Sequence, residues 1–275
     1  MAGVGPGRRI VESSAAGSGL IGVDDIVVLN ASSKAGKYYA KAEINSVESV
    51  SGRKITLRRP TAFDYSDVSE THRIRVVGRY GVGTGSVTGL DGEPAYVVRN
   101  AGLRNLTLTG SNSAGFKALH LSCFDCAFSE LTLNHYAGIT GNPCGGTVIN
   151  NIEANFVGRG IELGYLTNHS TLENVHLHRV ATSTDGAKFI LGCLTGSEDG
   201  GALNHWRTVH VEEDAVSDTA RSIAEAAGNG DIVGDVKIKS GGQAGISGMG
   251  ISGASSIVRN ITVSGAQGAG IRIGA

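Results

Sequence analysis

One pattern of apolar and polar positions recurs from about residue 95 onward. It reads apolar, any residue, small polar or acidic, apolar, any residue, apolar, and it first appears as Leu103–Leu108. Its third position returns every 21 to 34 residues and is filled in turn by Asn105, Glu130, Asn151, Asn174, Thr208, Asp235 and Asn260. A period of this size is typical of repeat architectures, in which each unit buries its apolar positions only against its neighbours.

A second, shorter apolar pattern lies between these segments, as in Leu119–Leu121 and Ile161–Leu163. Each repeat therefore holds at least two short strands of period 2, separated by Gly, Asn and Ser turns. Propeller blades need about 40 residues, and leucine-rich repeats need a denser leucine framework. The pattern predicts an all-β fold over residues 95–275, a single-stranded right-handed parallel β-helix, or solenoid, of about seven coils. Asn105, Asn151, Asn174 and Asn260 would then stack in one column and bond through their amides.

The chain before the repeats has a different organisation. The glycine- and serine-rich residues 1–19 are expected to form a flexible leader, and residues 20–94 a small N-terminal β block that leads into the solenoid. Strands are predicted near Ile26–Leu29, Tyr39–Val50, Lys54–Leu57 and His72–Val77. Within the repeats, the segment from Ser217 to Ala227 is expected to form a short helix.

Charge and composition exclude several classes of function. Lys and Arg number 24 against 25 Asp and Glu, so bulk charge predicts no polyanion partner, and aromatics at 5% argue against nucleic acid. No apolar run approaches the ~20 residues that cross a bilayer, so membrane insertion is not expected. We identify no secretory signal, which favours a virion (tail) or an extracellular location reached by another route. No cofactor is predicted.

Residues between the inward apolar positions point outward and form two neighbouring columns. The first contains Thr107, Thr132, Glu153, His176, His210, Lys237 and Thr262, and the second contains Thr109, Asn134, Asn155, His178, Glu212, Lys239 and Ser264. One interpretation is a saccharide groove with acid and base residues. The candidate catalytic residues are Glu153, Glu212, Asp214, His176 and His210, and the candidate substrate-binding residues are His178, Asn155, Lys237 and Lys239. The alternative is an ordinary solvated sheet face.

Spacing limits how these carboxylates could cooperate. Glu153 and Glu212 would lie roughly 12 Å apart, beyond the roughly 6.5–9.5 Å of an inverting pair. Glu212 and Asp214 would lie about 7 Å apart if their strand continues. His176, His178 and His210 with Glu153 also have a workable metal spacing, but exposed histidines on a strand need no ligand, so no metal site is predicted.

The four cysteines are too few for a disulfide framework in a chain of 275 residues. Cys123 and Cys126 form a CxxC without two further nearby ligands. An alignment of the second strands pairs Cys123 with Cys193, and it predicts that both are small buried fillers in inward columns.

The sheet motif resembles that of the pectate-lyase-like right-handed parallel β-helix superfamily, on Asn105–Leu108, Asn174–Leu177 and Asn260–Val263 with the Gly-x-x-Ile turns that follow. The block from Asp24 to Tyr65, followed by His72–Arg75, is similar to segments that precede the helix in phage tailspike and tail-fibre proteins. The calcium-binding aspartates and the catalytic arginine of pectate lyases are not recognisable, so no family catalytic residue is carried over.

This resemblance implies a virion tail protein that binds bacterial surface polysaccharide, with or without degrading it. It also implies a homotrimer that contacts other virion tail proteins. Two alternatives remain: a polysaccharide lyase or glycoside hydrolase fragment of an exported enzyme, and a non-catalytic structural or adhesive solenoid.

Overall fold

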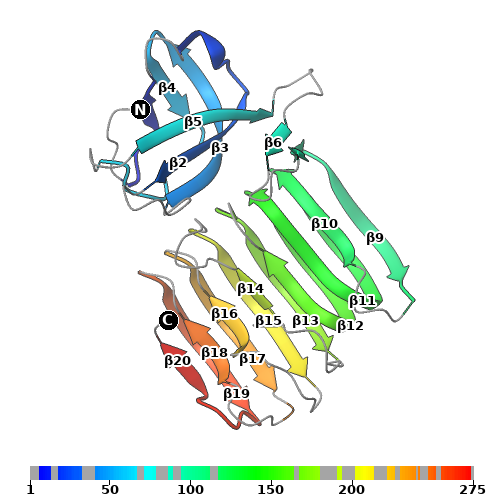
Figure 1. The fold of residues 1–275 in the computed structure, drawn as a ribbon. Coiled ribbons are helices and arrows are strands. Elements are labelled where there is room, and N and C mark those ends of the chain that lie inside the picture. Colours follow the sequence, from blue (N-terminus) through cyan, green and yellow to red (C-terminus); the bar gives the residue numbers. More distant parts are fainter. Residues whose placement is uncertain are drawn as a thin grey trace.

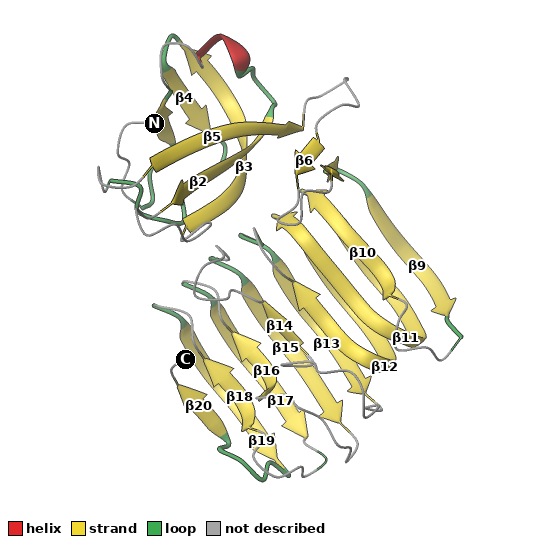
Figure 2. Ribbon diagram, in the orientation of Figure 1, coloured by secondary structure: helices red, strands yellow, loops and turns green. Residues whose placement is uncertain are grey.

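The computed structural model describes residues 6–13, 18–32, 41–66, 71–78, 86–88, 94–111, 117–163, 167–179, 191–193, 202–213, 222–226, 230–239, 241, 247–251 and 255–273. Strands dominate these ranges, and the helix drawn in Figure 2 is the single 3-10 turn Ser18–Leu20. None of the helical structure within them is long and apolar enough to span a bilayer.

The N-terminal block is a five-stranded antiparallel sheet in the order β1-β4-β3-β2-β5. Its strands are β1 (Ile10–Glu12), β2 (Ile26–Ser32), β3 (Lys41–Ser51), β4 (Lys54–Leu57) and β5 (Thr71–Gly78). The four predicted strands of this block are confirmed. The expectation of a flexible leader is wrong for Ile10–Glu12, because Val11 is fully buried and β1 pairs with β4.

The described strands from Val98 onward form a parallel β-solenoid, as predicted. Figure 1 shows its strands stacked side by side, below the N-terminal block. A short antiparallel pair, β6 (Ser86–Thr88) and β7 (Pro94–Tyr96), lies between the two parts along the chain. The division at residue 94 stays a prediction.

Two ladders of parallel strands build the solenoid. The first ladder runs β9 (Gly102–Thr109), β11 (Ala127–Gly145), β12 (Val148–Leu163), β13 (Thr171–Arg179), β15 (His205–Glu213), β17 (Ile232–Lys239) and β19 (Ile257–Ser264). The second runs β10 (Lys117–Phe124), the later halves of β11 and β12, β14 (Leu191–Cys193), β16 (Ser222–Ala226), β18 (Ser247–Ile251) and β20 (Ile271–Ile273), with β8 (Val98–Arg99) beside β10.

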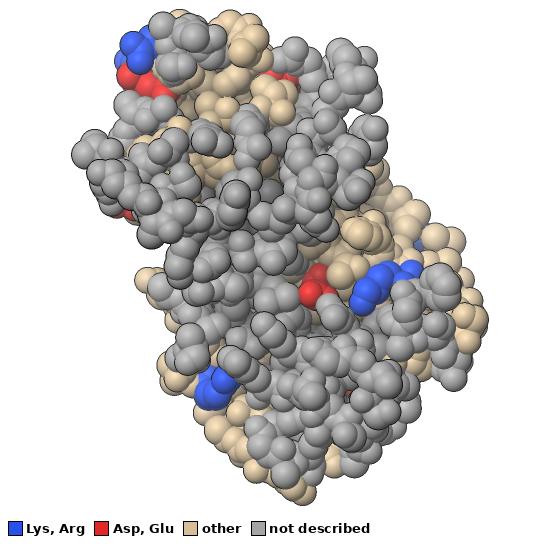
Figure 3. All heavy atoms as spheres, in the orientation of Figure 1, with Lys and Arg blue, Asp and Glu red and all other residues tan. Residues whose placement is uncertain are grey.

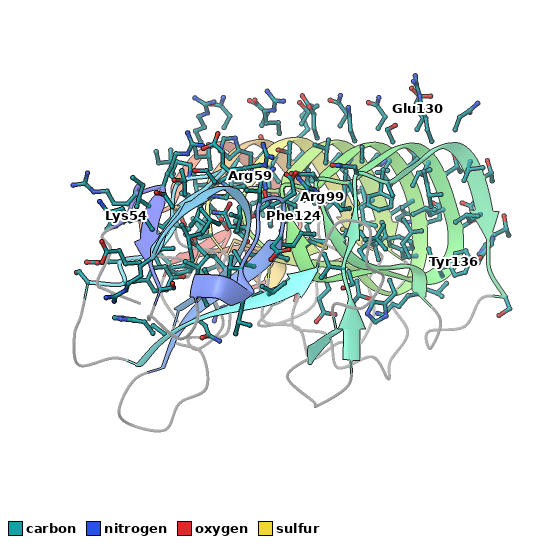
Figure 4. All side chains as sticks on the ribbon, turned by 90° about the horizontal axis from the view of Figure 1, so that it is seen from above. Lys54, Arg59, Arg99, Phe124, Glu130 and Tyr136 are labelled. Atoms are coloured by element: carbon teal, nitrogen blue, oxygen red, sulfur yellow. The ribbon has the colours of Figure 1, made fainter. Side chains whose placement is uncertain are left out.

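Each repeat of the first ladder bends at one residue with left-handed backbone. This left-handed column occupies the third position of the sequence pattern: Asn105, Glu130, Asn151, Asn174, Thr208, Asp235 and Asn260 have φ between 52° and 56°. The left-handed residue adds one position to the strand. As a result, the apolar residue two positions before it and those one and three positions after it all face inward, which explains the pattern. Glu130 lies in a row of outward side chains in Figure 4.

Side-chain amides bond along this column, as predicted for its asparagines. Asn174 Nδ2 donates to Asn151 Oδ1 at 3.1 Å, and Asn260 Nδ2 donates to Asp235 Oδ1 at 2.9 Å. Asparagine and aspartate adopt left-handed backbone more readily than other side chains do, apart from glycine. The repeated Asn therefore serves both the backbone conformation and the contact between coils.

The solenoid core contains a polar ladder besides its apolar columns. Trp206, fully buried, is the largest side chain of the apolar core. At the corner preceding the first ladder, Thr147, Ser170, Asn204 and Asp231 are all buried. The side chains of the last three each accept a backbone N–H from the preceding coil: Thr147 N donates to Ser170 Oγ, Ser170 N to Asn204 Oδ1, and Asn204 N to Asp231 Oδ1. Burial without such partners would cost about 1–3 kcal/mol per group.

The structure corrects two further expectations. Ser222–Ala226 forms strand β16 where a helix was predicted, because Ala224 occupies a buried position in the second ladder; residues 217–221 and 227 lie outside the described ranges. The register pairs Cys123 with Cys144, whereas Leu121 leads through Gly141 and Leu163 to Cys193. The alignment of the second strands was therefore wrong by two residues. Cys123, Cys126 and Cys144 are buried free thiols, as fillers would be.

Asn168 joins the N-terminal block to a corner of the solenoid. Its fully buried amide accepts from Ile44 N at 3.1 Å and donates to Ile44 O at 3.0 Å, so it pairs with β3 as a strand neighbour would. Beside it, Arg59 forms an ion pair with Asp125 and lies 4.9 Å from the ring centroid of Phe124. Figure 4 shows Arg59 and Phe124 together where the block meets the solenoid.

Gly146 makes room for this arginine. Its φ is 59°, and a Cβ built on it would lie 2.0 Å from Arg59 Nη2. A side chain at this corner would therefore displace the guanidinium from Asp125.

Charged residues elsewhere form small groups: on the face drawn in Figure 3, described acidic and basic side chains lie scattered over both parts of the molecule.

Within the left-handed column, replacing threonine by asparagine should stabilise the fold, and replacing asparagine by threonine should destabilise it. Thr208 is the one β-branched residue among the described non-glycine residues with positive φ. Left-handed backbone costs roughly 1–2 kcal/mol for most residues and less for Asn. Thr208→Asn should therefore raise the free energy of unfolding by about 1 kcal/mol, and the matched Asn174→Thr should lower it by at least as much. Urea unfolding measures both, and shifts of the same sign would contradict this account.

Candidate functional site

The first outward row crosses the middle of the solenoid and carries the titratable residues Glu153, His176, His210 and Lys237. The register aligns Thr132 with Glu153, Glu153 with His176, His176 with His210, and His210 with Lys237. These residues lie two positions after the left-handed column, where backbone alternation turns side chains away from the core. Neighbouring coils are separated by about 4.8 Å, so adjacent members of the row can touch.

The second outward row runs parallel to the first, two residues further along each strand. It aligns Asn134, Asn155, His178, Glu212 and Lys239. Asn155 Nδ2 donates to Asn134 Oδ1 at 2.9 Å. The structure therefore places eight of the nine predicted site residues on two adjacent rows. The ninth, Asp214, lies outside the described residues.

Glu153 and the two histidines of the first row form a continuous cluster. His176 Nδ1 lies 2.9 Å from Glu153 Oε1 and 3.1 Å from Glu153 Oε2. The rings of His176 and His210 stack with centroids 4.8 Å apart and planes inclined by 11°. His176 Nδ1 therefore carries the proton that it donates to the carboxylate, and the Nε2 atom of the same ring points elsewhere.

Glu212 connects this cluster to the second row. Its Oε1 lies 3.3 Å from His210 Nε2, and its Oε2 lies 3.8 Å from Lys239 Nζ. The two carboxylates Glu153 and Glu212 are thus linked through the stacked histidines. Lys237 is exposed beside His210 in the first row.

The cluster borders a hollow on the outer face. This outer hollow has a volume of about 460 Å³ and is lined by Asn151, Ile152, Glu153, Asn174, Val175, His176, Thr208 and His210. Its polar groups come from two sources, the left-handed column and the first outward row. Asn151, Asn174 and Thr208 were not among the predicted site residues. These three residues occupy the polar third position of the repeat, which could have indicated them. The sequence analysis interpreted that position only as a column of stacked side chains.

His210 titrates below the usual range for histidine. Burial is the largest cause of its lowered pKa, and the charges of His176, Lys237 and Lys239 lower it further, while Glu212 acts in the opposite direction. The neutral imidazole is already the main form at pH 7 at the ordinary pKa of 6.5, and the lowered pKa favours it further. A neutral imidazole can accept a proton or bind a metal ion.

The same side chains also form a possible metal-binding group. His176, His210 and Glu212 can each offer one ligand atom, and these atoms all lie within 4.8 Å of one another. The trio differs from the alternative considered from sequence, in which His178 and Glu153 were ligands. His178 lies in the second outward row, and Glu153 bonds to Nδ1 of His176.

Comparisons with known proteins give little beyond this geometry. No protein-family model matches the sequence, and no curated protein matches it. Among solved structures, the chain is similar to the tailspike protein gp49 from Pseudomonas phage LKA1, at 10% identity and a TM-score of 0.36. The match covers 100% of this chain but 62% of the tailspike chain, less than two thirds of its length. A likeness this weak assigns neither family nor activity, so kinship with the pectate-lyase-like superfamily stays a prediction.

Charge substitutions around His210 should move its pKa in predictable directions. Lys237→Gln and Lys239→Gln should each raise it, because each removes a positive charge that disfavours the imidazolium. Glu212→Gln should lower it further, because it removes the stabilising carboxylate. An NMR titration of the histidine ring resonances measures all three. Lys54→Gln, in the N-terminal block, is the control and should leave it unchanged. A higher pKa in Glu212→Gln would contradict the assignment.

Proposed function

We propose that this chain is a virion tailspike or tail-fibre protein that binds a bacterial surface polysaccharide along its outward rows. The observation that carries the proposal is the outer hollow, in which amide, carboxylate and imidazole groups converge on one open face. Sugars present many hydroxyl groups, and side chains of these types can both donate to them and accept from them. The volume of about 460 Å³ is within the range of small-ligand sites, about 300–1,000 Å³.

The solenoid suits a polymer better than a single small molecule. Outward rows repeat at every coil, so equivalent positions on both sides of the hollow continue the same polar face. Thr132 and Asn134 extend it toward one end, and Lys237 and Lys239 toward the other, with Asn155 beside the hollow in the second row. The two lysines favour a glycan with acidic groups near that end. A homotrimer and contacts with other tail proteins belong to this proposal and rest on the resemblance to tailspikes.

Removing one amide from the hollow should weaken glycan binding. Asn174→Gly keeps the left-handed backbone but deletes a side chain that lines the hollow. Loss of one or two hydrogen bonds should reduce affinity about tenfold, since each contributes about 0.5–1.5 kcal/mol. Binding would be screened against capsular polysaccharides and lipopolysaccharides and quantified by calorimetry on the glycan that binds.

Asn260→Gly is the matched control for that variant. Asn260 occupies the same left-handed column and bonds to its neighbour in the same way, but it does not line the hollow. It should bind with the affinity of the unmodified chain. Equal losses in the two variants would place the binding surface elsewhere, and no binding to any glycan of the panel would reject the proposal.

Cleavage of the bound glycan is a second candidate, favoured by the contact between Glu153 and His176. A carboxylate that holds an imidazole in one tautomer is a common arrangement for moving a proton. Glu153→Gln should then reduce release of reducing ends or of unsaturated sugars at least a hundredfold, the usual range for general acid–base groups. Unsaturated products would indicate a lyase and new reducing ends alone a hydrolase. Undiminished cleavage in Glu153→Gln and Glu212→Gln would exclude this cluster as catalytic, and binding without cleavage would indicate an adhesive protein.

A further inference from the structure

His176 presents a ring nitrogen that has no partner. Its Nε2 atom is shielded from solvent and makes no hydrogen bond, although the side chain as a whole is 42% exposed. Its Nδ1 atom donates to Glu153, so in the neutral ring Nε2 is the nitrogen that carries the lone pair. A buried acceptor without a donor is unfavourable, and a water molecule, a hydrogen-bond donor or a metal ion can satisfy it.

The contact with Glu153 is the kind of support that metal-binding histidines have. Such histidines usually donate the N–H of their other ring nitrogen to a carboxylate, which fixes the tautomer and makes the ligating nitrogen more basic. His176 has this arrangement on Nδ1, at 2.9 Å from Glu153 Oε1. Glu153 therefore matches the supporting carboxylate, and Nε2 matches the ligand atom.

Two further candidate ligands lie close to His176. His210 and Glu212 offer atoms that lie within 4.8 Å of each other and of the His176 ligand atom. Ligand atoms around tetrahedral zinc lie roughly 3.4 Å apart, given Zn–N distances of about 2.0–2.1 Å. The rings now stack in parallel, so binding requires them to rotate until both lone pairs converge. Both are about two-fifths exposed and have room to turn.

We propose that His176, His210 and Glu212 bind Zn²⁺, with Glu153 as the positioning carboxylate of His176. Two imidazoles and one carboxylate suit zinc and neighbouring transition metals, and they suit calcium and magnesium poorly. The ion replaces the proton between His210 Nε2 and Glu212 Oε1, and the neutral ring then carries its proton on Nδ1. Three protein ligands would leave the fourth position of a tetrahedral zinc ion to a water molecule. This site goes beyond the proposed function, because it needs no glycan.

The positive charge of Lys239 should weaken metal binding, and removing it tests the proposed site. Its ammonium lies 3.8 Å from Glu212 Oε2, where it competes for the carboxylate, and Lys237 adds positive charge nearby. The Lys239 side chain is 65% exposed and can move into solvent when the ion binds. Removing its charge should therefore tighten metal binding, an effect that a merely structural role of Glu212 would not produce.

Calorimetry of the full chain with Zn²⁺ alone tests the site. We expect saturable binding of one ion, no binding of Ca²⁺, and a tetrahedral absorption spectrum with Co²⁺. His176→Gln and His210→Gln should each weaken binding at least about thirtyfold, and Glu153→Gln about tenfold, as other supporting carboxylates do. Lys239→Gln should strengthen binding a few-fold. These side chains are on the outer face, so circular dichroism should show unchanged folding.

His178→Gln is the matched control, since His178 lies on the same strand but in the second row. It should bind Zn²⁺ as the unmodified chain does. Failure of Zn²⁺ to bind, or equal weakening in His178→Gln and His176→Gln, would overturn the assignment. Because no sugar is present, these outcomes are independent of glycan binding, and loss of glycan binding in Asn174→Gly would leave the metal result untouched.

Discussion

The parallel register between coils is the constraint from which the other features of the solenoid follow. Every coil of the first ladder has its left-handed residue at the same position along the strand. The strand segments before and after the bend therefore stay in register from β9 to β19. A coil without that extra residue would shift its later half by one position and turn its apolar side chains outward. The amide bond between Asn151 and Asn174 reinforces the alignment from the outside, and the buried polar ladder ending at Asp231 reinforces it from within.

The same constraint brings the candidate site together. Glu153, His176 and His210 are 23 and 34 residues apart in sequence, yet they meet because each lies two positions after a left-handed residue. Stacking also affects the chemistry of the histidines, since burial, followed by the neighbouring His176 and the lysines of the next coil, lowers the pKa of His210. On an irregular surface such a cluster would require several independent loops, whereas here one repeated geometry supplies it.

Sequence reasoning could find what repeats and missed what occurs once. The apolar columns, the strands of the N-terminal block and the two outward rows follow from periodicity. The strand β1 was missed because only Val11 anchors it, and β16 was mistaken for a helix because its small residues carry no alternating apolar signal. The outer hollow was missed because a left-handed residue is invisible in an apolar pattern. The trio of His176, His210 and Glu212 depends on which ring nitrogen Glu153 occupies, and sequence does not record that.

A repetitive solenoid offers a docking domain nearly equivalent positions at each coil, and Asn168 removes that ambiguity. The residues bridged to it on the neighbouring coils are Gly145 and Ala202, neither of which has an amide to offer β3. Of these three described levels, only that of Asn168 can thus satisfy both backbone groups of Ile44. Asn168 therefore determines which coil the N-terminal block contacts. It sets the position of the block along the solenoid axis, and with it the separation between the block and the histidine cluster.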